Sequence, residues 1–502
     1  MTEAGGAGGA SPAGGALRAG AAVGGRAGRL GRGDLPPDVR VLPPGPRARG
    51  ISRRLARAEA PGINTLAGPP GEEAPALLWA EARGANVLDV DGNRYVDLTS
   101  GFGVAAVGHR HPRVVAAVRR QAGRLLHGLG DVHAHPLRVE LAERLAAVVP
   151  VRGRRGSLGA GEAGGVRGDR DGGGGGGREG GARDSTVYFG ISGAEAVEIA
   201  AKTALLATGR PGVLAFDPGY HGLTLGALAA TSRPEFRRPF APWLHPHVER
   251  LPFGADPGRV AAVLGRGGTG CVLVEPIVGR EGVVLPPPGW LAAVAAACRE
   301  AGALLVADEV YTGFGRTGTL FAVEQLGEDG GPVEPDLLVC GKALGGGLPI
   351  AAVIGRRELF AGWRTGGEAL HTATFVANPL ACAAALAVLE VLAGERLVER
   401  AARLGRQVGA CLAIWPERFA AVAEVRGRGL LWGIELRDRD AARRLVAEAA
   451  ARGVLLLAGG PQGRVAQVVP PLTIAEEQLA GALDVLEEVL GADRVGRPPP
   501  AG

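Results

Sequence analysis

Residues 304–308 read LLVAD and residues 337–342 read LLVCGK. Each stretch is a short apolar run followed by a reactive side chain, Asp308 in the first and Lys342 in the second. Short continuous apolar runs are typical of strands that are buried on both faces of a parallel sheet. Helical patterns lie between such runs, so the sequence predicts an α/β domain with a mostly parallel sheet.

Further strands and helices extend outward from these two runs. Strand candidates lie at 187–189, 213–216 and 271–274, and helical periodicity is found at 114–123, 137–148, 194–208 and 290–301. Beyond about residue 384 long helices rich in Ala, Leu and Arg dominate, with one strand candidate at 431–436. We therefore expect a second, smaller domain of α+β type.

Two segments hold too few large apolar side chains to offset the entropy of ordering them. Residues 1–50 are dominated by Gly, Ala, Pro and Arg, and residues 153–183 include six consecutive glycines, Gly172 to Gly177. We expect both segments to be disordered, the second as a surface insertion in the larger domain.

Charge and cysteine usage exclude several classes of protein. The formal net charge is +5, and the ten Arg and four acidic residues of residues 1–60 account for all of it, which gives little support to nucleic-acid binding. No apolar run reaches the ~18 residues that suggest a membrane span. The five cysteines form no CxxC pair, which fits a reducing compartment and predicts a cytoplasmic protein. Three His-x-His spacings lack a clustered third ligand, so no metal site is expected.

Lysine usage is the most informative count. Only two of the 56 basic residues are lysines, Lys202 and Lys342. Most surface lysines can be replaced by arginine, but a lysine whose amine forms a covalent bond cannot, because a guanidinium is a poor nucleophile. Lys342 is therefore a candidate catalytic residue, whereas Lys202 fits a structural role better.

Four predicted strand ends carry polar or small residues. They are Ser192-Gly193-Ala194 before a helix, Glu275, Asp308 and Lys342. Ligands of parallel sheets bind beyond the carboxyl ends of the strands, and a helix N-terminus offers free N–H groups to a phosphate. We expect these residues to line one crevice.

The stretches around Asp308 and Lys342, ADEVYTGFGRTG (307–318) and PDLLVCGKALGGGLPIAAVIGR (335–356), resemble those of a known family. The family is the class-III (ω-) aminotransferases, pyridoxal-phosphate enzymes of fold type I that include the 4-aminobutyrate, acetylornithine and ornithine aminotransferases. The resemblance keeps family order over about residues 75–490. It rests on GHRHPRVVAAV (108–118), SGAEAVEIAAK (192–202), YHG (220–222), VEPI (274–277), ADEVYTGFGRTG (307–318), PDLLVCGKALGGGLPIAAVIGR (335–356), HTATFVANPLACAAALAVLE (371–390) and VRGRGLLWGIEL (425–436).

The resemblance implies an aspartate-aminotransferase-like architecture. The pyridoxal-phosphate-binding large domain would span 108–384 and contain the insertion at 153–183. The smaller α+β domain would combine the N-terminal segment 51–107 with the C-terminal region 385–492, followed by a tail at 493–502.

The resemblance also implies roles around pyridoxal 5′-phosphate. Lys342 would carry the cofactor as an imine and move the substrate proton, while Asp308 would keep the pyridine nitrogen protonated. Val310 and Tyr220 would pack on the two faces of the ring. The backbone of Gly193 and Ala194 would hold the phosphate.

Other implied contacts complete the site. Thr374 from a neighbouring subunit would reach the phosphate, so the active site would be shared within a homodimer. Glu275 would lie near the substrate or near O3′ of the cofactor. Tyr311, which stands where the family has Gln, could donate a hydrogen bond to O3′.

The chain departs from the family at the substrate pocket. The family's carboxylate-binding Arg and its gating Glu are replaced by Gln467 and Arg280, so we hypothesise that Arg280 anchors the carboxylate of the keto acid. Leu223 replaces an Arg that can reach a distal carboxylate. Phe102 and Trp363 would make the pocket more apolar.

The resemblance predicts a ping-pong transfer of an ω-amino group from an amino acid or amine to a 2-oxo acid or aldehyde. Racemases and decarboxylases of similar sequence use the same Lys–Asp–phosphate set, so these activities stay open. An inactive pyridoxal-phosphate-binding homologue is disfavoured by the retained Lys342. A nucleotide-binding protein is disfavoured because no GxGxxG motif with a partner acid follows a strand.

Overall fold

A computed structural model describes residues 27–60, 63, 76–151, 185–364 and 366–492. A seven-stranded sheet forms the centre of the larger domain, in the order β4-β10-β9-β8-β7-β5-β6. The strands are β4 (Ser185–Gly190), β5 (Gly212–Asp217), β6 (Val248–Pro252), β7 (Thr269–Val274), β8 (Leu304–Asp308), β9 (Leu337–Cys340) and β10 (Ala351–Arg356). Only β10 runs antiparallel to its neighbours, which confirms the predicted mostly parallel sheet.

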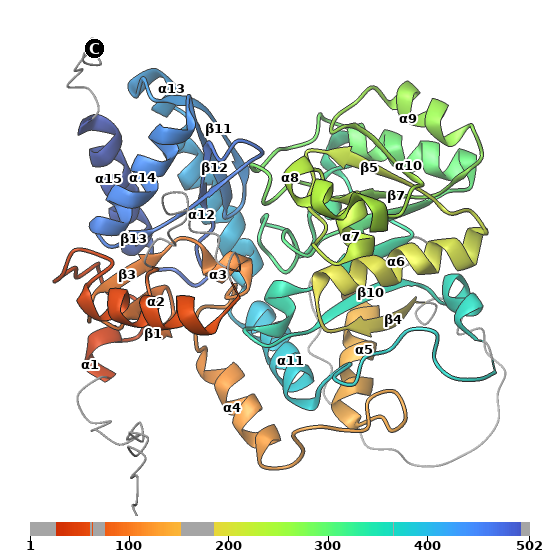
Figure 1. The fold of residues 1–502 in the computed structure, drawn as a ribbon, viewed down its shortest axis with the longest axis horizontal. Coiled ribbons are helices and arrows are strands. Elements are labelled where there is room, and N and C mark those ends of the chain that lie inside the picture. Colours follow the sequence, from red (N-terminus) through yellow and green to blue (C-terminus); the bar gives the residue numbers. More distant parts are fainter. Residues whose placement is uncertain (1–26, 61–62, 64–75, 152–184, 365, 493–502) are drawn as a thin grey trace, which may run out of the picture.

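Helices cover both faces of this sheet (Figure 1). Because successive strand side chains point to opposite faces, Leu304 and Val306 of β8 join one apolar core and Leu305 and Ala307 join the other. The first core includes α6 (Gly193–Thr208), and the second includes α5 (Pro136–Val148), α10 (Trp290–Ala301) and α11 (Pro379–Gly394). The sheet is thus buried on both sides, as its apolar strands require.

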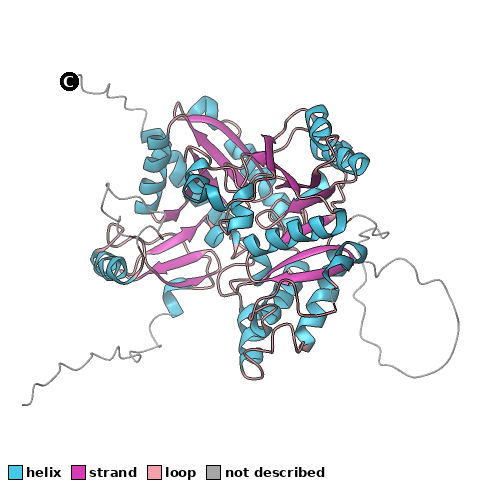
Figure 2. Ribbon diagram, turned by 45° about the vertical axis from the view of Figure 1, so that its right-hand side comes forward, coloured by secondary structure: helices cyan, strands magenta, loops and turns pink. Residues whose placement is uncertain are grey.

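The smaller domain joins the two ends of the chain. One of its sheets has the order β1-β2-β3-β13 and the other has the order β11-β12-β15-β14, and both are visible in Figure 2. Strand β3 pairs in parallel with β13, with Val96 opposite Val454, so the N-terminal and C-terminal segments form one α+β unit as predicted. The strands are β1 (Trp79–Arg83), β2 (Asn86–Asp89), β3 (Arg94–Asp97), β11 (Val422–Arg428), β12 (Leu431–Leu436), β13 (Val454–Leu455), β14 (Leu457–Gly459) and β15 (Val465–Val468).

The remaining helical elements lie around these sheets. Those in the C-terminal part of the smaller domain include α12 (Leu397–Leu412), α14 (Arg439–Ala451) and α15 (Glu476–Ala492). The others are α1 (Ala27–Leu30), α2 (Pro46–Ala58), α3 (Ser100–Gly103), α4 (Pro112–Ala122), α7 (Leu225–Ala230), α8 (Pro234–Arg237), α9 (Pro257–Leu264) and α13 (Trp415–Arg418), with 3₁₀ helices η1 (Arg238–Trp243), η2 (Ala322–Gln325), η3 (Glu328–Gly330), η4 (Lys342–Gly345) and η5 (Arg357–Trp363). None of the described helices is both long and apolar enough to cross a membrane.

The structure differs from the prediction near the N-terminus. Disorder was expected over 1–50, yet residues 27–50 contain α1 and the start of α2. Side chains of β2 and of the turn that follows it hold this segment, because Asn86, Asp91 and Asn93 bond to its backbone. Polar contacts of this kind join residues that are far apart in the chain, so they produce no periodic pattern in the sequence. Residues 1–26, 153–183 and 493–502 lie outside the described part of the chain.

The expected domain boundary after residue 384 falls within a helix. Helix α11 continues through it from Pro379 to Gly394 and packs against α4 and α5 of the larger domain. The helix therefore belongs to the larger domain. The change in amino-acid composition near residue 384 comes before the structural boundary between the domains.

Candidate functional site

The four predicted strand ends meet in sheet order. Strands β9, β8 and β7 are neighbours, and they end at or just before Lys342, Asp308 and Glu275. Strand β4, on the far side of β10, leads into α6 at Gly193. Parallel strands place their carboxyl ends at one edge of a sheet, so Lys342, Asp308, Glu275 and Gly193 lie at the same edge.

Asp308 is buried and bonded to a histidine that the sequence interpretation gave no role. Its Oδ2 lies 2.8 Å from Nδ1 of His221, and its Oδ1 accepts a bond from the backbone N–H of Val310 at 3.1 Å. His221 is itself held by a bond from its N–H to Oγ1 of Thr231 at 3.0 Å. The imidazole therefore fixes the orientation of the carboxylate.

Glu275 holds two loops of the site together. Its carboxylate accepts bonds from the N–H of Tyr220 at 2.8 Å and from the N–H of Gly279 at 3.0 Å. Burial raises the pKa of Glu275 to about 7, and the nearby Asp308 charge adds to that rise while His221 opposes it. Both carboxylate oxygens are engaged by backbone, which favours a positioning role.

Lys342 has the features of a nucleophilic amine. Its Nζ lies 4.1 Å from the centre of the Tyr311 ring and, within the described residues, has no hydrogen-bond acceptor. Burial lowers its pKa to about 8, although the charges of Asp308 and Glu275 act in the opposite direction. Its φ of 42° is in the left-handed region, and backbone strain of this kind is concentrated at functional sites.

The N-terminus of α6 forms an anion cradle beside this amine. The N–H groups of Gly193 and Ala194 have no acceptor among the described residues. A Cβ at Gly193 would lie 2.9 Å from Cγ1 of Val310, and a Cβ at Gly222, whose φ is 126°, would lie 2.4 Å from Cβ of Ala194. Only glycines allow the loop after Tyr220 and the side chain of Val310 to approach the helix end so closely.

The residues present therefore fit pyridoxal 5′-phosphate. The unpaired amine of Lys342 suits its aldehyde, the buried Asp308 suits its ring nitrogen, and the open N-terminus of α6 suits its phosphate.

The predicted substrate residues are placed as follows. The amide of Gln467 donates to the carbonyls of Gly279 and Arg280, each at 3.1 Å, and its oxygen lies 3.5 Å from the Tyr311 hydroxyl. Tyr311 therefore points toward Gln467. The Arg280 guanidinium lies 4.3 Å from the centre of the Tyr220 ring.

Other predicted residues lie farther out. Phe102 is half exposed, and it precedes Gly103, where a Cβ would meet the Tyr311 ring at 3.6 Å. Leu223 is also half exposed, and Trp363 packs on Tyr188. Thr374 is exposed beside Gly130 and forms no hydrogen bond to Gly193 or Lys342 within the described chain.

The remaining lysine and three of the paired histidines have structural partners. Lys202 bonds to His371 at 2.9 Å. His111 and His135 cap helices α4 and α5, and His109 pairs with Asp97. The described residues contain no group of three or more side chains that could hold a metal ion.

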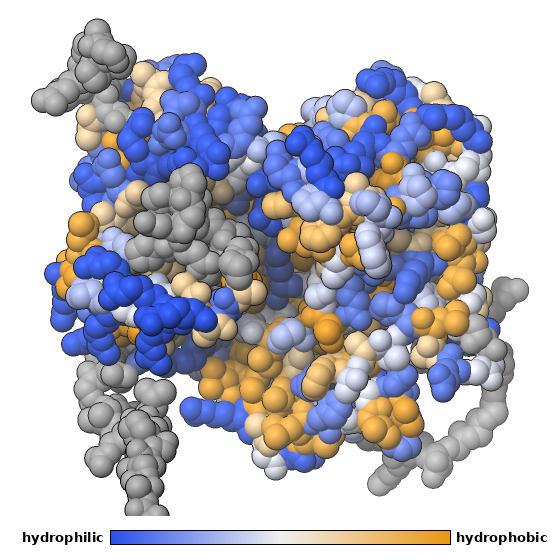
Figure 3. Space-filling view, in the orientation of Figure 1, coloured by the Kyte–Doolittle hydropathy of each residue, from blue (hydrophilic) through white to orange (hydrophobic). Residues whose placement is uncertain are grey.

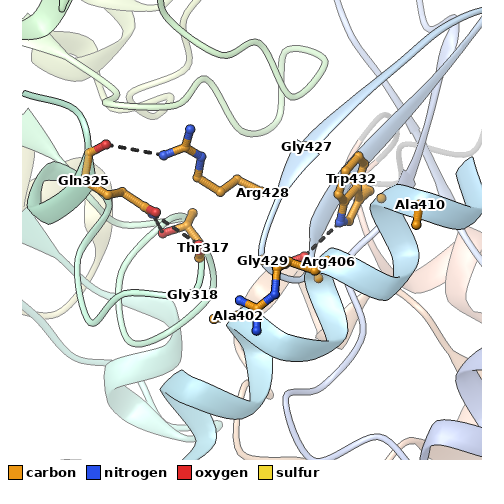
Figure 4. A pocket seen from close by; sticks show the side chains of 12 residues that line it. Thr317, Gly318, Gln325, Ala402, Arg406, Ala410, Gly427, Arg428, Gly429 and Trp432 are labelled. Carbon is orange, nitrogen blue, oxygen red and sulfur yellow. Dashed lines mark hydrogen bonds between the residues drawn. The ribbon is translucent and has the colours of Figure 1, made fainter. Parts of the chain in front are cut away.

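A separate cavity of about 350 Å³ lies between the two domains, away from these residues (Figure 4). Arg406, Arg428 and Trp432 line it, and Arg428 donates to the carbonyl of Gln325.

Comparisons with known proteins point to one family. The family model "Aminotransferase class-III" matches residues 67–159 and 179–490. The acetylornithine aminotransferase of Methanothermobacter thermautotrophicus is 36% identical and aligns with 82% of this chain and 94% of its own. The 4-aminobutyrate aminotransferase of Mycobacterium bovis is 35% identical, with 89% and 96% covered. The solved structure of the ornithine aminotransferase from Toxoplasma gondii superposes with a TM-score of 0.73 at 29% identity, covering 89% of this chain and 94% of that one.

Proposed function

Because this chain belongs to the class-III aminotransferase family, we propose that Lys342 binds pyridoxal 5′-phosphate covalently and moves the substrate proton. The chain is an aminotransferase that transfers an amino group from an amino donor to an oxo acceptor. When bound, the cofactor acts as an electron sink for the substrate carbon that loses its proton. The observation that carries the proposal is the unpaired Lys342 amine beside the buried Asp308–His221 pair.

The other residues of the site would position the cofactor. The carboxylate of Asp308 would hold the proton on the pyridine nitrogen, and the N–H groups of Gly193 and Ala194 would bind the phosphate. Val310 and Tyr220 would enclose the ring. Glu275 would hold the loop that carries Tyr220 and the loop that carries Gly279 in fixed positions, through its bonds to the N–H groups of these two residues.

The relatives suggest the substrate class. Their names describe enzymes acting on acetylornithine, 4-aminobutyrate and ornithine, all of which carry an amino group at the end of an aliphatic chain. An ω-amino donor and a 2-oxo acid acceptor therefore fit this chain best. The five free cysteines are consistent with our expectation of a cytoplasmic location.

We further propose a homodimer. Large apolar side chains are exposed on the loop after α4 and on the segment before α11: Leu125, Leu126, Leu129, Val132, Leu370 and Phe375. The two segments touch, since the His127 and Phe375 rings lie 5.3 Å apart. Figure 3 shows apolar surface over this part of the molecule. Patches of this kind are typical of protein interfaces, and Thr374 lies within this one.

A donor panel tests the proposed reaction. On addition of an ω-amino acid, the absorption of the loaded enzyme should change from the aldehyde form of the cofactor to its amine form, and a 2-oxo acid should restore it. A racemase or decarboxylase would not accumulate the amine form, so a spectrum that never converts with any donor would contradict the proposal.

Loading of the apoenzyme should depend on pH through Lys342. Only the unprotonated amine attacks an aldehyde, so the rate of covalent loading should rise with pH and level off above about 8. An ordinary lysine would give a midpoint about two units higher. Stopped-flow absorbance between pH 6 and 10.5, with each rate extrapolated to saturating pyridoxal phosphate, measures the midpoint. A rate that still rises above pH 10 would contradict the lowered pKa.

A further inference from the structure

Arg280 is a cation without an acidic partner at the edge of the site. Among the described residues it forms no ion pair, and its guanidinium lies over Tyr220 at 4.3 Å and Phe236 at 5.6 Å. Its charge lowers the pKa of Lys342, so it lies within electrostatic reach of the reacting amine. Stacking on rings holds a guanidinium plane in place while its N–H edge stays available to an anion.

The neighbouring charges are already paired. The carboxylate of Glu281 lies 2.8 Å from Nε of Arg233, whose Nη2 also donates to the carbonyl of Gly460 at 2.8 Å. Arg316 is fully buried and bonded to the carbonyl of Leu430 at 3.0 Å. Neither of these arginines is available to a substrate, whereas Arg280 has no acidic partner among the described residues and lies over two rings.

The peptide that carries Arg280 is held from the smaller domain. The carbonyl of Arg280 accepts bonds from Nε2 of Gln467 and from the N–H of Gly460, both at 3.1 Å. Nε2 of Gln467 also donates to the carbonyl of Gly279 at 3.1 Å. Both hydrogens of the Gln467 amide are thereby committed to backbone, which leaves Gln467 no donor for a substrate carboxylate.

Two glycines make room for this arrangement. A Cβ at Gly459 would lie 2.5 Å from Nε2 of Gln467 and 2.6 Å from the carbonyl oxygen of Arg280. A Cβ at Gly279 would lie 2.5 Å from the Tyr311 ring, whose hydroxyl faces Gln467. Strand β14, strand β15 and the loop after Glu275 are therefore fitted to one another around this peptide.

From this geometry we propose that Arg280 is the specificity-determining residue that binds the carboxylate of the substrate, and that Gln467 is a positioning residue that fixes the Arg280 peptide. The inference rests on the proposed aminotransferase function and adds a substrate class to it. A fixed guanidinium selects amines that carry a carboxylate at the far end over neutral amines, and it repels diamines.

Three donors of equal length test the charge preference. They are 4-aminobutyrate, butan-1-amine and butane-1,4-diamine, whose far ends are anionic, neutral and cationic. Arg280→Met should raise the KM for 4-aminobutyrate about 10- to 100-fold, the range for losing a charged hydrogen bond, and leave that for butan-1-amine unchanged. Arg280→Glu should make the diamine the preferred donor. Arg406→Met, which removes an arginine from the separate cavity, is the matched control and should change none of the three.

A binding measurement keeps the two proposals distinguishable. Butanoate carries the carboxylate but no amine, so its dissociation constant measured by calorimetry reports on Arg280 without turnover. If no donor converts the cofactor but butanoate binding still weakens in Arg280→Met, the proposed reaction is wrong, whereas the proposed role of Arg280 in binding a carboxylate is supported. If turnover is normal and Arg280→Met changes the KM of all three donors equally, the proposed role of Arg280 in binding a carboxylate is overturned.

Gln467→Leu separates positioning from folding. The Gly279 carbonyl keeps bonds from the N–H groups of Gly282 and Val283, and the Arg280 carbonyl keeps its bond from Gly460. Both carbonyls therefore stay paired, and the Tyr311 hydroxyl loses only a long contact of 3.5 Å. We expect a several-fold rise in KM for 4-aminobutyrate, an unchanged kcat, and no further effect in an Arg280→Met background. Equal losses with butan-1-amine, or additive losses in the double variant, would reduce Gln467 to a structural role.

Discussion

Lys342→Arg should reduce transamination by about 10⁴-fold or more, because the variant keeps a positive charge but loses the nucleophilic amine. Guanidinium stays protonated in proteins and cannot bond to the cofactor aldehyde. The measurements are single-turnover conversion of the cofactor spectrum and borohydride trapping followed by peptide mapping. The wild-type chain should yield a pyridoxyl adduct on the peptide that contains residue 342, and the variant should yield none.

The composition of the chain supplies an unusually clean control for this experiment. Lys202 is the one other lysine in the sequence, and its amine bonds to His371 at 2.9 Å. Lys202→Arg keeps a donor for that bond, so the adduct and the activity should both persist. An adduct on the Lys202 peptide of wild-type protein, or retained turnover in Lys342→Arg, would overturn the assignment of the catalytic amine.

Asp308→Asn should lower the rate of proton removal from the donor by about 10²–10³-fold, the range for losing one preorganised electrostatic contact in an active site. Asparagine has nearly the same shape and still has an oxygen for the N–H of Val310 and a group for His221, so the fold should be retained. The lost charge is the one that holds the proton on the pyridine nitrogen. The same charge raises the pKa of Lys342, so loading of the variant should reach its plateau at a lower pH.

Glu309→Gln is the matched control for the loss of a buried charge. Glu309 is the next residue, but its carboxylate accepts bonds from Thr312 and from the N–H of Val323, and not from His221. Its pKa is raised to about 7 by burial. Rapid-mixing kinetics should show near-normal proton removal in Glu309→Gln. Equal losses in both variants would mean that Asp308 acts only through stability.

Local sequence was sufficient for the parts of the fold that depend on burial alone. The predicted strands at 271–274, 304–307 and 337–340 match β7, β8 and β9 closely, because strands buried on both faces must be apolar throughout. The helix predicted at 290–301 is α10. Strand β10 was not among the predicted strands, and its antiparallel insertion between β4 and β9 depends on pairing partners that its own residues do not specify.

Local sequence likewise identified some residues of the candidate site and missed others. Lys342, Asp308 and Glu275 were identifiable because each follows a strand at one edge of the sheet. His221 was missed, although it stands in the quoted YHG motif, because its bond to Asp308 joins loops that follow different strands. The two backbone bonds of Gln467 were equally invisible, since they cross between domains. The role of a side chain that orients another group can be recognised only in the folded structure.

The parallel pairing of β3 with β13 constrains the order in which the domains can fold during synthesis. All seven strands of the central sheet are translated before β13, so the larger domain can assemble while synthesis continues. Strand β3 leaves the ribosome early and has an open edge until nearly the whole polypeptide has emerged. Until β13 pairs with it, that edge keeps free N–H and C=O groups that can pair with another chain, so the smaller domain completes its fold last.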